Sequence, residues 1–321
     1  MKKLFIFSIT AAVALMACDK VNNAYPPGAI SSGLDWTLYP GGDSTTYVSN
    51  GLWPSFTANT NTLRNVLIED FTGHQCVNCP QQTQNMETFI SGNPTRIFGL
   101  AIHAGPAGMS GFQETTSNYP EELFCANGLE LGKHFGLDIP GSSFQGNPGF
   151  NVNRVLSNGQ FTTLANSTMV NKANTCLSST LQVNIQAVTN YFATTRGLFV
   201  HVEVDKIDQA LTSDLAIVTC LVEDSLVAPQ LVLANSTWDT DGTIDGRNTI
   251  YVHRDILRGM IDNRTFGKVL TAADLGTNNK YYVNYSYKLP TEYEADNMKL
   301  YIYVYDKNTQ EILQVIEKHL I

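Results

Sequence analysis

The spacing of apolar residues changes along the chain. From Asn65 to Ser179 the apolar residues come in short unbroken runs or at helical spacing, whereas from Leu181 onward they alternate with polar residues. An unbroken run is typical of a strand covered on both faces, and alternation is typical of a strand with one face in water. The pattern predicts an α/β domain over 61–179 and an all-β domain over 180–321.

The α/β part opens with a strand, a helix and a second strand. "NVLIEDF" (65–71) and "RIFGLAIH" (96–103) are the two apolar runs, and "PQQTQNMETFISG" (80–92) between them has its apolar residues on one side and ends in glycine. A strand, helix and strand in so short a span form a βαβ unit with a parallel strand pair and a right-handed crossover. A helix over 121–135, a strand after Pro148 and a helix over 164–179 are predicted to follow.

The remaining chain reads as strands alone. Six segments alternate apolar and polar residues and are separated by turn residues: 181–188, 198–207, 215–224, 280–289, 298–307 and 312–321. Short strands without intervening helices predict an antiparallel β-sandwich, which we expect to be immunoglobulin-like.

The N-terminus has the features of an export signal. Two lysines precede an apolar run from Leu4 to Ala17 that is too short to cross a bilayer, and Cys18 follows at once. This end resembles the lipobox of bacterial lipoproteins, which implies a signal peptide over 1–17 and a lipid on Cys18; the alternative is a secretory signal with a chance cysteine. Residues 18–60, rich in Asn, Ser, Thr, Gly and Pro, are predicted to form a tether.

Composition narrows the function classes. The chain has 321 residues, 43% of them hydrophobic, and a formal net charge of −9. The size and apolar content suit a globular protein with a sizeable core. The negative charge makes nucleic acid and anionic lipid unsuitable partners. No segment after residue 17 is apolar for long enough to cross a membrane, so acyl chains on Cys18 would be the only membrane anchor. We expect neither a cofactor nor a metal.

Five cysteines remain after Cys18, and an odd number cannot all pair. Cys220 lies in a strand that is apolar on both faces, which favours a buried thiol. Cys125 and Cys176 fall on predicted helices, and whether they pair is left open because pairing depends on the distance between them.

Cys76 and Cys79 form a Cys-x-x-Cys motif between the first strand and its helix. Backbone N–H groups at a helix start stabilise a thiolate, so Cys76 would be the nucleophile and Cys79 the resolving thiol. His74 could add positive charge. Two alternatives involve no redox chemistry. One is a structural disulfide, which would close too small a loop to stabilise the fold much, and the other is a zinc site.

The residues around this motif resemble thioredoxin. Asp70 and Phe71 precede Cys76 by six and five residues, the spacing at which thioredoxins carry a buried acid and an aromatic. The resemblance implies that Asp70 is the proton acceptor for Cys79. It also implies a cis-proline facing the dithiol; Pro148, which precedes an alternating segment, is the candidate preferred over Pro140. The residues beside and between the cysteines depart from the thioredoxin pattern.

Four segments in order, "FTGHQCVNCP", "NPGFNVNR", "VEDSLVAPQ" and "YVHRDILRG", together with the lipobox resemble the 28-kDa outer-membrane-protein family. The resemblance implies an outer-membrane lipoprotein, facing the periplasm or the cell surface, with a thioredoxin-like domain followed by a β-sandwich. It favours a binding or adhesion role toward a protein or glycan ligand. The alternative is a thiol-disulfide oxidoreductase of the cell envelope.

Two stripes of tyrosines bear on a glycan ligand. Alternate positions carry tyrosine on two predicted strands: Tyr281, Tyr285 and Tyr287 on one, Tyr301, Tyr303 and Tyr305 on the other. Such stripes either pack a core or stack on sugar rings.

Overall fold

A computed structural model describes residues 33–321 except 143, 235, 238–245 and 277. The predicted signal peptide over 1–17 and Cys18 therefore lie outside the described residues. Within the described part, no helix is long and apolar enough to cross a membrane.

The predicted strand–helix–strand unit is present. β1 (Val66–Thr72) is followed by α2 (Cys79–Ser91) and β2 (Ile97–His103), and the two strands are parallel, with Val66 opposite Ile97 and Thr72 opposite His103. The prediction of a parallel βαβ unit is thus confirmed. The carboxyl ends of both strands meet at one edge of the sheet.

Two further strands extend this sheet beside β1. β3 (Gly149–Val152) pairs antiparallel with β1 and with β4 (Thr162–Thr163), giving the local order β2-β1-β3-β4. α4 (Asn166–Leu177) follows β4, close to its predicted range.

The third helix of this half begins later than predicted. α3 (Ala126–Lys133) starts after Cys125, whose sulfur accepts a hydrogen bond from Gly128 N and so caps the helix. The prediction of a helix from Glu121 was wrong. In this segment Glu122 O accepts a hydrogen bond from Arg258, and Leu123 packs with Ala228 and Ile256, so contacts with the other half hold it outside the helix. A π-helical turn (His134–Asp138) continues α3.

The C-terminal half contains two facing β-sheets. β5 (Val183–Phe192), β6 (Gly197–Lys206) and β14 (Lys280–Lys288) form a three-stranded sheet. β7 (Leu215–Glu223), β15 (Met298–Asp306) and β16 (Ile312–His319) lie in the larger sheet, to which β13 (Lys268–Leu270) pairs along β7. Apolar residues of both sheets form one core between them. All six predicted strands are present.

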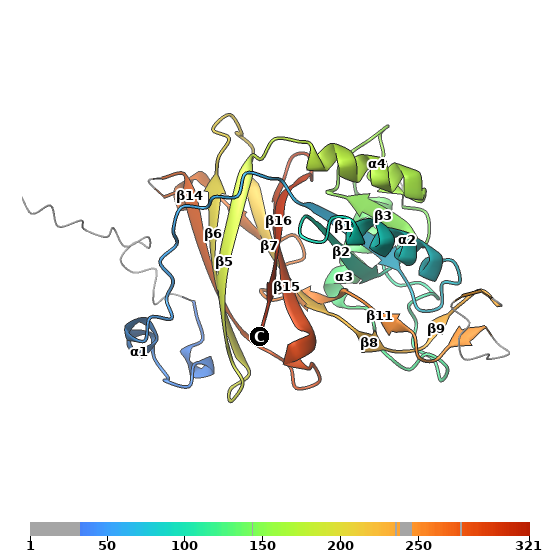
Figure 1. Ribbon diagram of the computed structural model, residues 1–321, viewed down its shortest axis with the longest axis horizontal. Helices are drawn as coiled ribbons and strands as arrows, with labels where there is room; N and C mark the ends of the chain where they lie inside the picture. Colours follow the sequence, from blue (N-terminus) through green and yellow to red (C-terminus); the bar gives the residue numbers. More distant parts are fainter. Residues whose placement is uncertain (1–32, 143, 235, 238–245, 277) are drawn as a thin grey trace, which may run out of the picture.

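The larger sheet continues from one half of the molecule into the other. Its strands run β16-β15-β7-β12-β2-β1-β3-β4, and β12 (Ile256–Met260) joins the halves by pairing antiparallel with β7 and parallel with β2, where Ile256 lies opposite Ala101. Figure 1 shows this sheet passing through the centre of the molecule. The fold is therefore mixed α/β around a shared sheet. The hydrophobic periodicity of the sequence does not predict that β12 pairs with both β2 and β7.

The two faces of the shared sheet have different covers. α3 packs on one face, in a cluster that includes residues of β1, β2, β7 and β15. On the opposite face, α2 and α4 cover the β1–β3 part, and the three-stranded sheet covers the β7–β15–β16 part. Short 3-10 helices at Ala272–Asp274 and Ala295–Asn297 lie in the connections.

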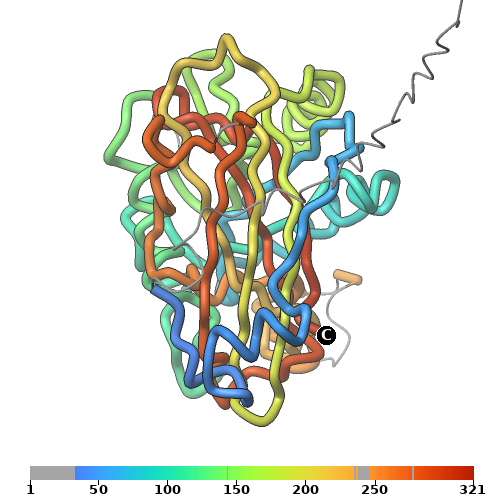
Figure 2. The backbone as a smooth tube through the Cα atoms, turned by 90° about the vertical axis from the view of Figure 1, so that its left-hand side faces the viewer, coloured from blue at the N-terminus to red at the C-terminus, as the bar shows by residue number. Residues whose placement is uncertain are grey.

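Part of the predicted tether is packed on the body. η1 (Trp36–Leu38) and α1 (Ser44–Ser49) lie against the outer face of the three-stranded sheet, where the chain runs across it in Figure 2. Trp36 stacks on Phe199 with ring centroids 5.5 Å apart. The hydroxyl oxygen of buried Tyr47 lies 2.8 Å from His201 Nε2. Residues 34–53 are therefore a docked segment.

Both tyrosine stripes pack the interior. Tyr301, Tyr303 and Tyr305 are at most 2% exposed, and Tyr281 and Tyr285 are 5% and 8% exposed. These rings belong to the core, so the sugar-stacking alternative does not apply to them.

A buried ion pair connects the two halves. Arg154, just after β3, donates from Nε to both carboxylate oxygens of Glu69 on β1 at 3.1 and 3.0 Å, and from Nη2 to the Tyr303 hydroxyl on β15 at 2.8 Å. Its guanidinium also lies over the rings of Phe135 and Tyr303. The "NPGFNVNR" segment thus supplies the contact that ties β1 to β15.

Candidate functional site

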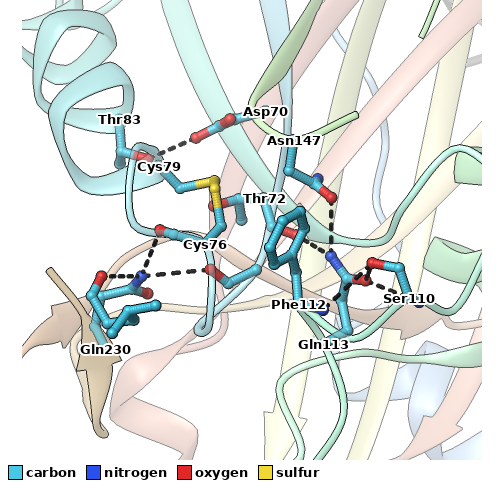
Figure 3. The surroundings of a disulfide bond; sticks show 12 residues. Asp70, Thr72, Cys76, Cys79, Thr83, Ser110, Phe112, Gln113, Asn147 and Gln230 are labelled. Carbon is cyan, nitrogen blue, oxygen red and sulfur yellow. Dashed lines mark hydrogen bonds between the residues drawn. A yellow bond between two sulfur atoms is a disulfide. The ribbon is translucent and has the colours of Figure 1, made fainter. Parts of the chain in front are cut away.

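Cys76 and Cys79 form a disulfide in the turn between β1 and α2. Cys76 N donates to Gly73 O, Cys79 N donates to Cys76 O, and Cys79 is the first residue of α2. The two cysteines are only 2% and 1% exposed. The disulfide therefore sits at the edge where β1 and β2 end, as Figure 3 shows, but beneath other parts of the chain.

Asp70 is a fully buried acid next to this disulfide. Its Oδ2 accepts a hydrogen bond of 2.8 Å from the Thr83 hydroxyl on α2, and its Oδ1 has no partner among the described residues. Burial raises the pKa of Asp70 to about 7, the Thr83 hydrogen bond opposes this rise, and the charge of Glu87 adds to it. Figure 3 shows the Asp70 carboxyl turned toward Thr83, on the Cys79 side of the disulfide.

Pro148 stands at the start of β3, after a cis peptide bond with Asn147. The next residue, Gly149, pairs with Phe71 of β1, which places Pro148 level with the end of that strand. Gln113 Nε2 donates to Thr72 O at 2.7 Å and to Asn147 Oδ1 at 3.2 Å, and so joins the ends of β1 and β3. The other candidate, Pro140, follows the π-helical turn after α3 and lies outside β3.

A cover loop, residues 104–120, closes one side of the disulfide. Phe112 O accepts from Gln75 N at 3.1 Å, and Glu114 O lies 2.9 Å from His74 Nε2. Gly73 packs so closely on this loop that a Cβ there would come within 2.6 Å of Phe112 O. The loop is thus bonded directly to the residues that precede Cys76.

A β-arm from the C-terminal half closes another side. It lies between β7 and β12 and consists of two short ribbons, β8 (Leu226–Val227) with β11 (Val252–His253) and β9 (Gln230–Leu231) with β10 (Arg247–Asn248). Gln230 Nε2 donates to Gly73 O at 3.3 Å and to Cys76 O at 3.2 Å, as drawn in Figure 3. Sequence analysis missed this arm, because strands of two residues have no periodicity to detect.

Three buried histidines lie where the arm meets the site. The ring centroids of His74 and His103 are 6.2 Å apart, and those of His103 and His253 are 5.6 Å apart. Burial lowers the pKa of all three, that of His253 to about 3. His74 is therefore neutral, and the predicted positive charge beside Cys76 is absent at neutral pH. Within the described part of the chain, no group of three or more His, Cys, Asp or Glu side chains could hold a metal ion.

The surface next to the covered disulfide is apolar. A pocket of about 380 Å³ is lined by Gln75, Ser110, Gly111, Phe112 and Leu231. Phe112 is 41% exposed, and Met109 in the same loop is 38% exposed.

The other described cysteines are free thiols. Cys125 packs on the α3 side of the shared sheet and Cys176 on the α4 side, so the sheet separates them and they do not pair. Cys220 is fully buried beside Met260, and burial raises its pKa well above the usual value, as expected of an unreactive thiol.

The chain has recognisable relatives. The profile of the family described as outer membrane protein Omp28 matches residues 142–320. Among solved structures, HBP35 of Porphyromonas gingivalis is similar with a TM-score of 0.57 and 16% identity, over 82% of this chain and 77% of that chain. A domain of the outer membrane lipoprotein Omp28 from Porphyromonas gingivalis is 19% identical over 42% of this chain and 85% of that chain, with a TM-score of 0.27. Comparison with curated proteins found no match.

The chain belongs to the outer membrane protein Omp28 family, since the profile matches more than half of its length. The location expected from the sequence, the outer membrane, follows from this membership. The likeness to HBP35 concerns the fold alone. The family match begins at residue 142, so Cys76 and Cys79 lie outside the matched range.

Proposed function

We propose that this outer-membrane protein carries out thiol-disulfide exchange at Cys76 and Cys79, on a thioredoxin-like domain over 61–179, with a lipid on Cys18 as its anchor. The strand order β2-β1-β3-β4 with helices on both faces supports the thioredoxin-like assignment. The β-sandwich over 180–321, which we assign as immunoglobulin-like, would then supply the β-arm that covers the dithiol.

One observation carries the proposal. Asp70 is buried behind the disulfide with a pKa of about 7, so its carboxyl group can hold or release a proton at physiological pH. A disulfide that only held the turn together would not need a costly buried acid beside it. When a partner thiolate attacks Cys76, the S–S bond breaks, and the electron pair passes to Cys79, which takes a proton from Asp70.

The test is the rate at which dithiothreitol reduces the disulfide of the folded chain, followed by alkylation and mass spectrometry. Asp70→Asn removes the proton donor and is expected to slow reduction about 100-fold at pH 7. Asp214→Asn is the control, because Asp214 is exposed and precedes β7, at the end of that strand away from its pairing with β12. Equal rates for Asp70→Asn and the unmodified chain would overturn the proposal.

A binding or adhesion role is the second candidate, favoured by the burial of both cysteines and by the exposed Phe112 and Met109 beside them. In this case the surface around Phe112, and not the chemistry of the disulfide, would contact a protein ligand. Replacing both Cys76 and Cys79 with serine distinguishes the two functions. Loss of exchange with retained attachment of cells to a host-protein surface supports binding, whereas unchanged attachment of cells lacking the whole chain excludes it.

A further inference from the structure

We propose that Thr83 and Glu87, on successive turns of α2, form the proton path that connects the buried Asp70 to solvent during thiol-disulfide exchange. The inference rests on the proposed function and adds two residues to its machinery. It answers a requirement of the geometry, because the sulfur atoms and the acid are all closed off from solvent.

The first step is the isolation of Asp70. It is fully buried, both cysteines are at most 2% exposed, and the Thr83 hydroxyl is the only hydrogen-bond partner of its carboxyl among the described residues. A proton that Asp70 gives to Cys79 has to be replaced before the next exchange. Thr83 is the one polar contact through which this replacement can arrive.

The second step is a pocket on the other side of Thr83. Thr83 and Glu87 line a pocket of about 330 Å³ beside α2, together with Asp224, Arg254, Asp255 and Lys299. This volume admits many water molecules, each of which needs about 10–15 Å³ by this kind of measure. The Thr83 hydroxyl donates its hydrogen to Asp70, which leaves its lone pairs able to accept one from the pocket. Thr83 thus contacts both the buried acid and the pocket.

The third step singles out Glu87 among the acids of the pocket. Lys299 Nζ lies 2.5 Å from Asp255 Oδ1, and Arg254 Nη1 lies 3.5 Å from Asp224 Oδ1, so these carboxylates are held as ion pairs. Glu87 has no ion pair or hydrogen bond with its carboxylate in the described part of the chain. It is one helical turn from Thr83, which brings the two side chains to the same face of α2.

The electrostatics agree with this geometry. Burial raises the pKa of Glu87, the charges of Asp255 and Asp224 add to the rise, and Arg254 opposes it. A carboxyl group with a raised pKa exchanges protons closer to neutral pH, which suits transfer to an acid whose pKa is about 7. The charge of Glu87 also raises the pKa of Asp70, so the two groups sense each other.

The complete exchange with a partner dithiol then balances. One partner thiolate bonds to Cys76 Sγ, the Cys76–Cys79 bond breaks, and Cys79 Sγ takes the electron pair and the Asp70 proton. Thr83 passes its proton to Asp70 and receives one from pocket water, which Glu87 resupplies. The second partner thiolate attacks the mixed disulfide and releases Cys76 as a thiolate. Two electrons have moved from the partner dithiol, now oxidised, to the protein disulfide, now reduced.

The experiment measures disulfide reduction by dithiothreitol from pH 6 to pH 9 in water and in deuterium oxide. Thr83→Val keeps the shape but removes the relay hydroxyl, and we expect it to slow reduction about tenfold and to raise the solvent isotope effect. Thr83→Ser retains the hydroxyl and is expected to restore both. Thr88→Val is the matched control, because Thr88 is exposed on the same helix.

Glu87→Gln is expected to slow reduction severalfold and to move the midpoint of the pH profile to lower pH, because a negative charge near Asp70 is lost. Glu121→Gln, at an exposed position outside the pocket, should change neither. If Asp70→Asn slows the reaction while Thr83→Val and Glu87→Gln keep the rate, isotope effect and pH profile of the unmodified chain, the proton path is wrong and exchange stands. If Asp70→Asn has no effect, the proposed function itself fails.

Discussion

Glu69 and Asp70 are neighbours on β1, and both are fully buried, yet their surroundings differ completely. Glu69 faces the α3 side of the shared sheet, where Arg154 donates to both of its carboxylate oxygens. Asp70 faces α2, where one hydroxyl group is its only hydrogen-bond partner among the described residues. One acid is neutralised by a fixed partner, whereas the other is left able to change its protonation state.

The comparison shows how a strand separates an acid that is held in an ion pair from one that is not. Successive residues of a strand point to opposite faces, so a single position decides which surroundings a carboxyl group meets. A paired and hydrogen-bonded charge holds two parts of a fold in register, and an unpaired buried acid instead shifts its pKa. The predictions below test this division, beginning with the largest effect.

Removing the partner of Glu69 is expected to have the largest effect. Arg154→Ala leaves a fully buried carboxylate without its cation and should lower the free energy of unfolding by about 3–5 kcal/mol. The measurement is urea unfolding at pH 7. Arg254→Ala is the control, since its side chain is half exposed and its ion pair should contribute about 1 kcal/mol or less. A loss for Arg154→Ala as small as that of the control would contradict a structural role for the pair.

Asp70→Asn should raise the free energy of unfolding at high pH, whereas Arg154→Ala lowers it. The pKa of Asp70 is about 7 in the folded chain and about 3.9 in an unfolded one, so its protonation stabilises the fold below pH 4 and this contribution is lost as pH rises to 7. The variant avoids this loss and should be more stable at pH 8, by up to about 4 kcal/mol, since each pH unit between the two pKa values corresponds to about 1.4 kcal/mol. Urea unfolding at pH 4.5 and pH 8 measures the difference. A difference that is the same at both pH values would show that Asp70 does not titrate as described.

His253 extends the comparison to a buried base on the β-arm. The pKa of His253 is about 3 in the folded chain and about 6.5 when unfolded. Its contribution to the stability of the fold is therefore complete above pH 6.5 and is lost as pH falls below that value. His253→Gln should reduce the acid-induced loss of stability by about 2 kcal/mol between pH 7 and pH 5. His319→Gln serves as the control, because His319 is mostly exposed. Parallel stability curves for His253→Gln and the unmodified chain would count against a neutral His253 at the junction.

Gln230→Ala probes the cover that the β-arm places over Cys76 and should have the smallest effect on stability. It removes the side-chain hydrogen bonds to Gly73 O and Cys76 O, at a cost of about 1 kcal/mol. Reduction of the disulfide by dithiothreitol should become severalfold faster, because the arm then leaves the sulfur atoms more often. Gln209→Ala, in an exposed turn, should leave the rate unchanged. A slower reaction in Gln230→Ala would mean that the arm assists exchange.

Much of the fold could be predicted because its elements are local. β1, α2, β2 and the six long C-terminal strands follow from runs and alternation within single segments. The joint of β12 with β2 could not be predicted in this way, because it pairs residues 155 positions apart, Ile256 with Ala101. The β-arm could not be predicted for a different reason: each of its strands has only two residues, too few to show a periodicity.

The residues of the candidate site also differ in whether the sequence alone could identify them. Asp70, Cys76 and Cys79 are close in sequence, so their spacing could identify them. The ion pair of Glu69 was overlooked, although a charged residue in an otherwise apolar strand covered on both faces signals a buried partner. His253 and Gln230 reach the site from the other half, and only the folded sheet brings them there.

The docked segment sets how far the protein can stand from its membrane. With lipid on Cys18 and the whole polar stretch to residue 60 free, the extended chain could reach about 150 Å. Because residues 34–53 are packed on the outer face of β5, β6 and β14, a chain anchored by the proposed lipid on Cys18 would have only the residues before 34 to reach the membrane, at most about 55 Å when extended. The dithiol lies in the half of the molecule away from that point of attachment, so a partner has to meet it within a layer of limited thickness.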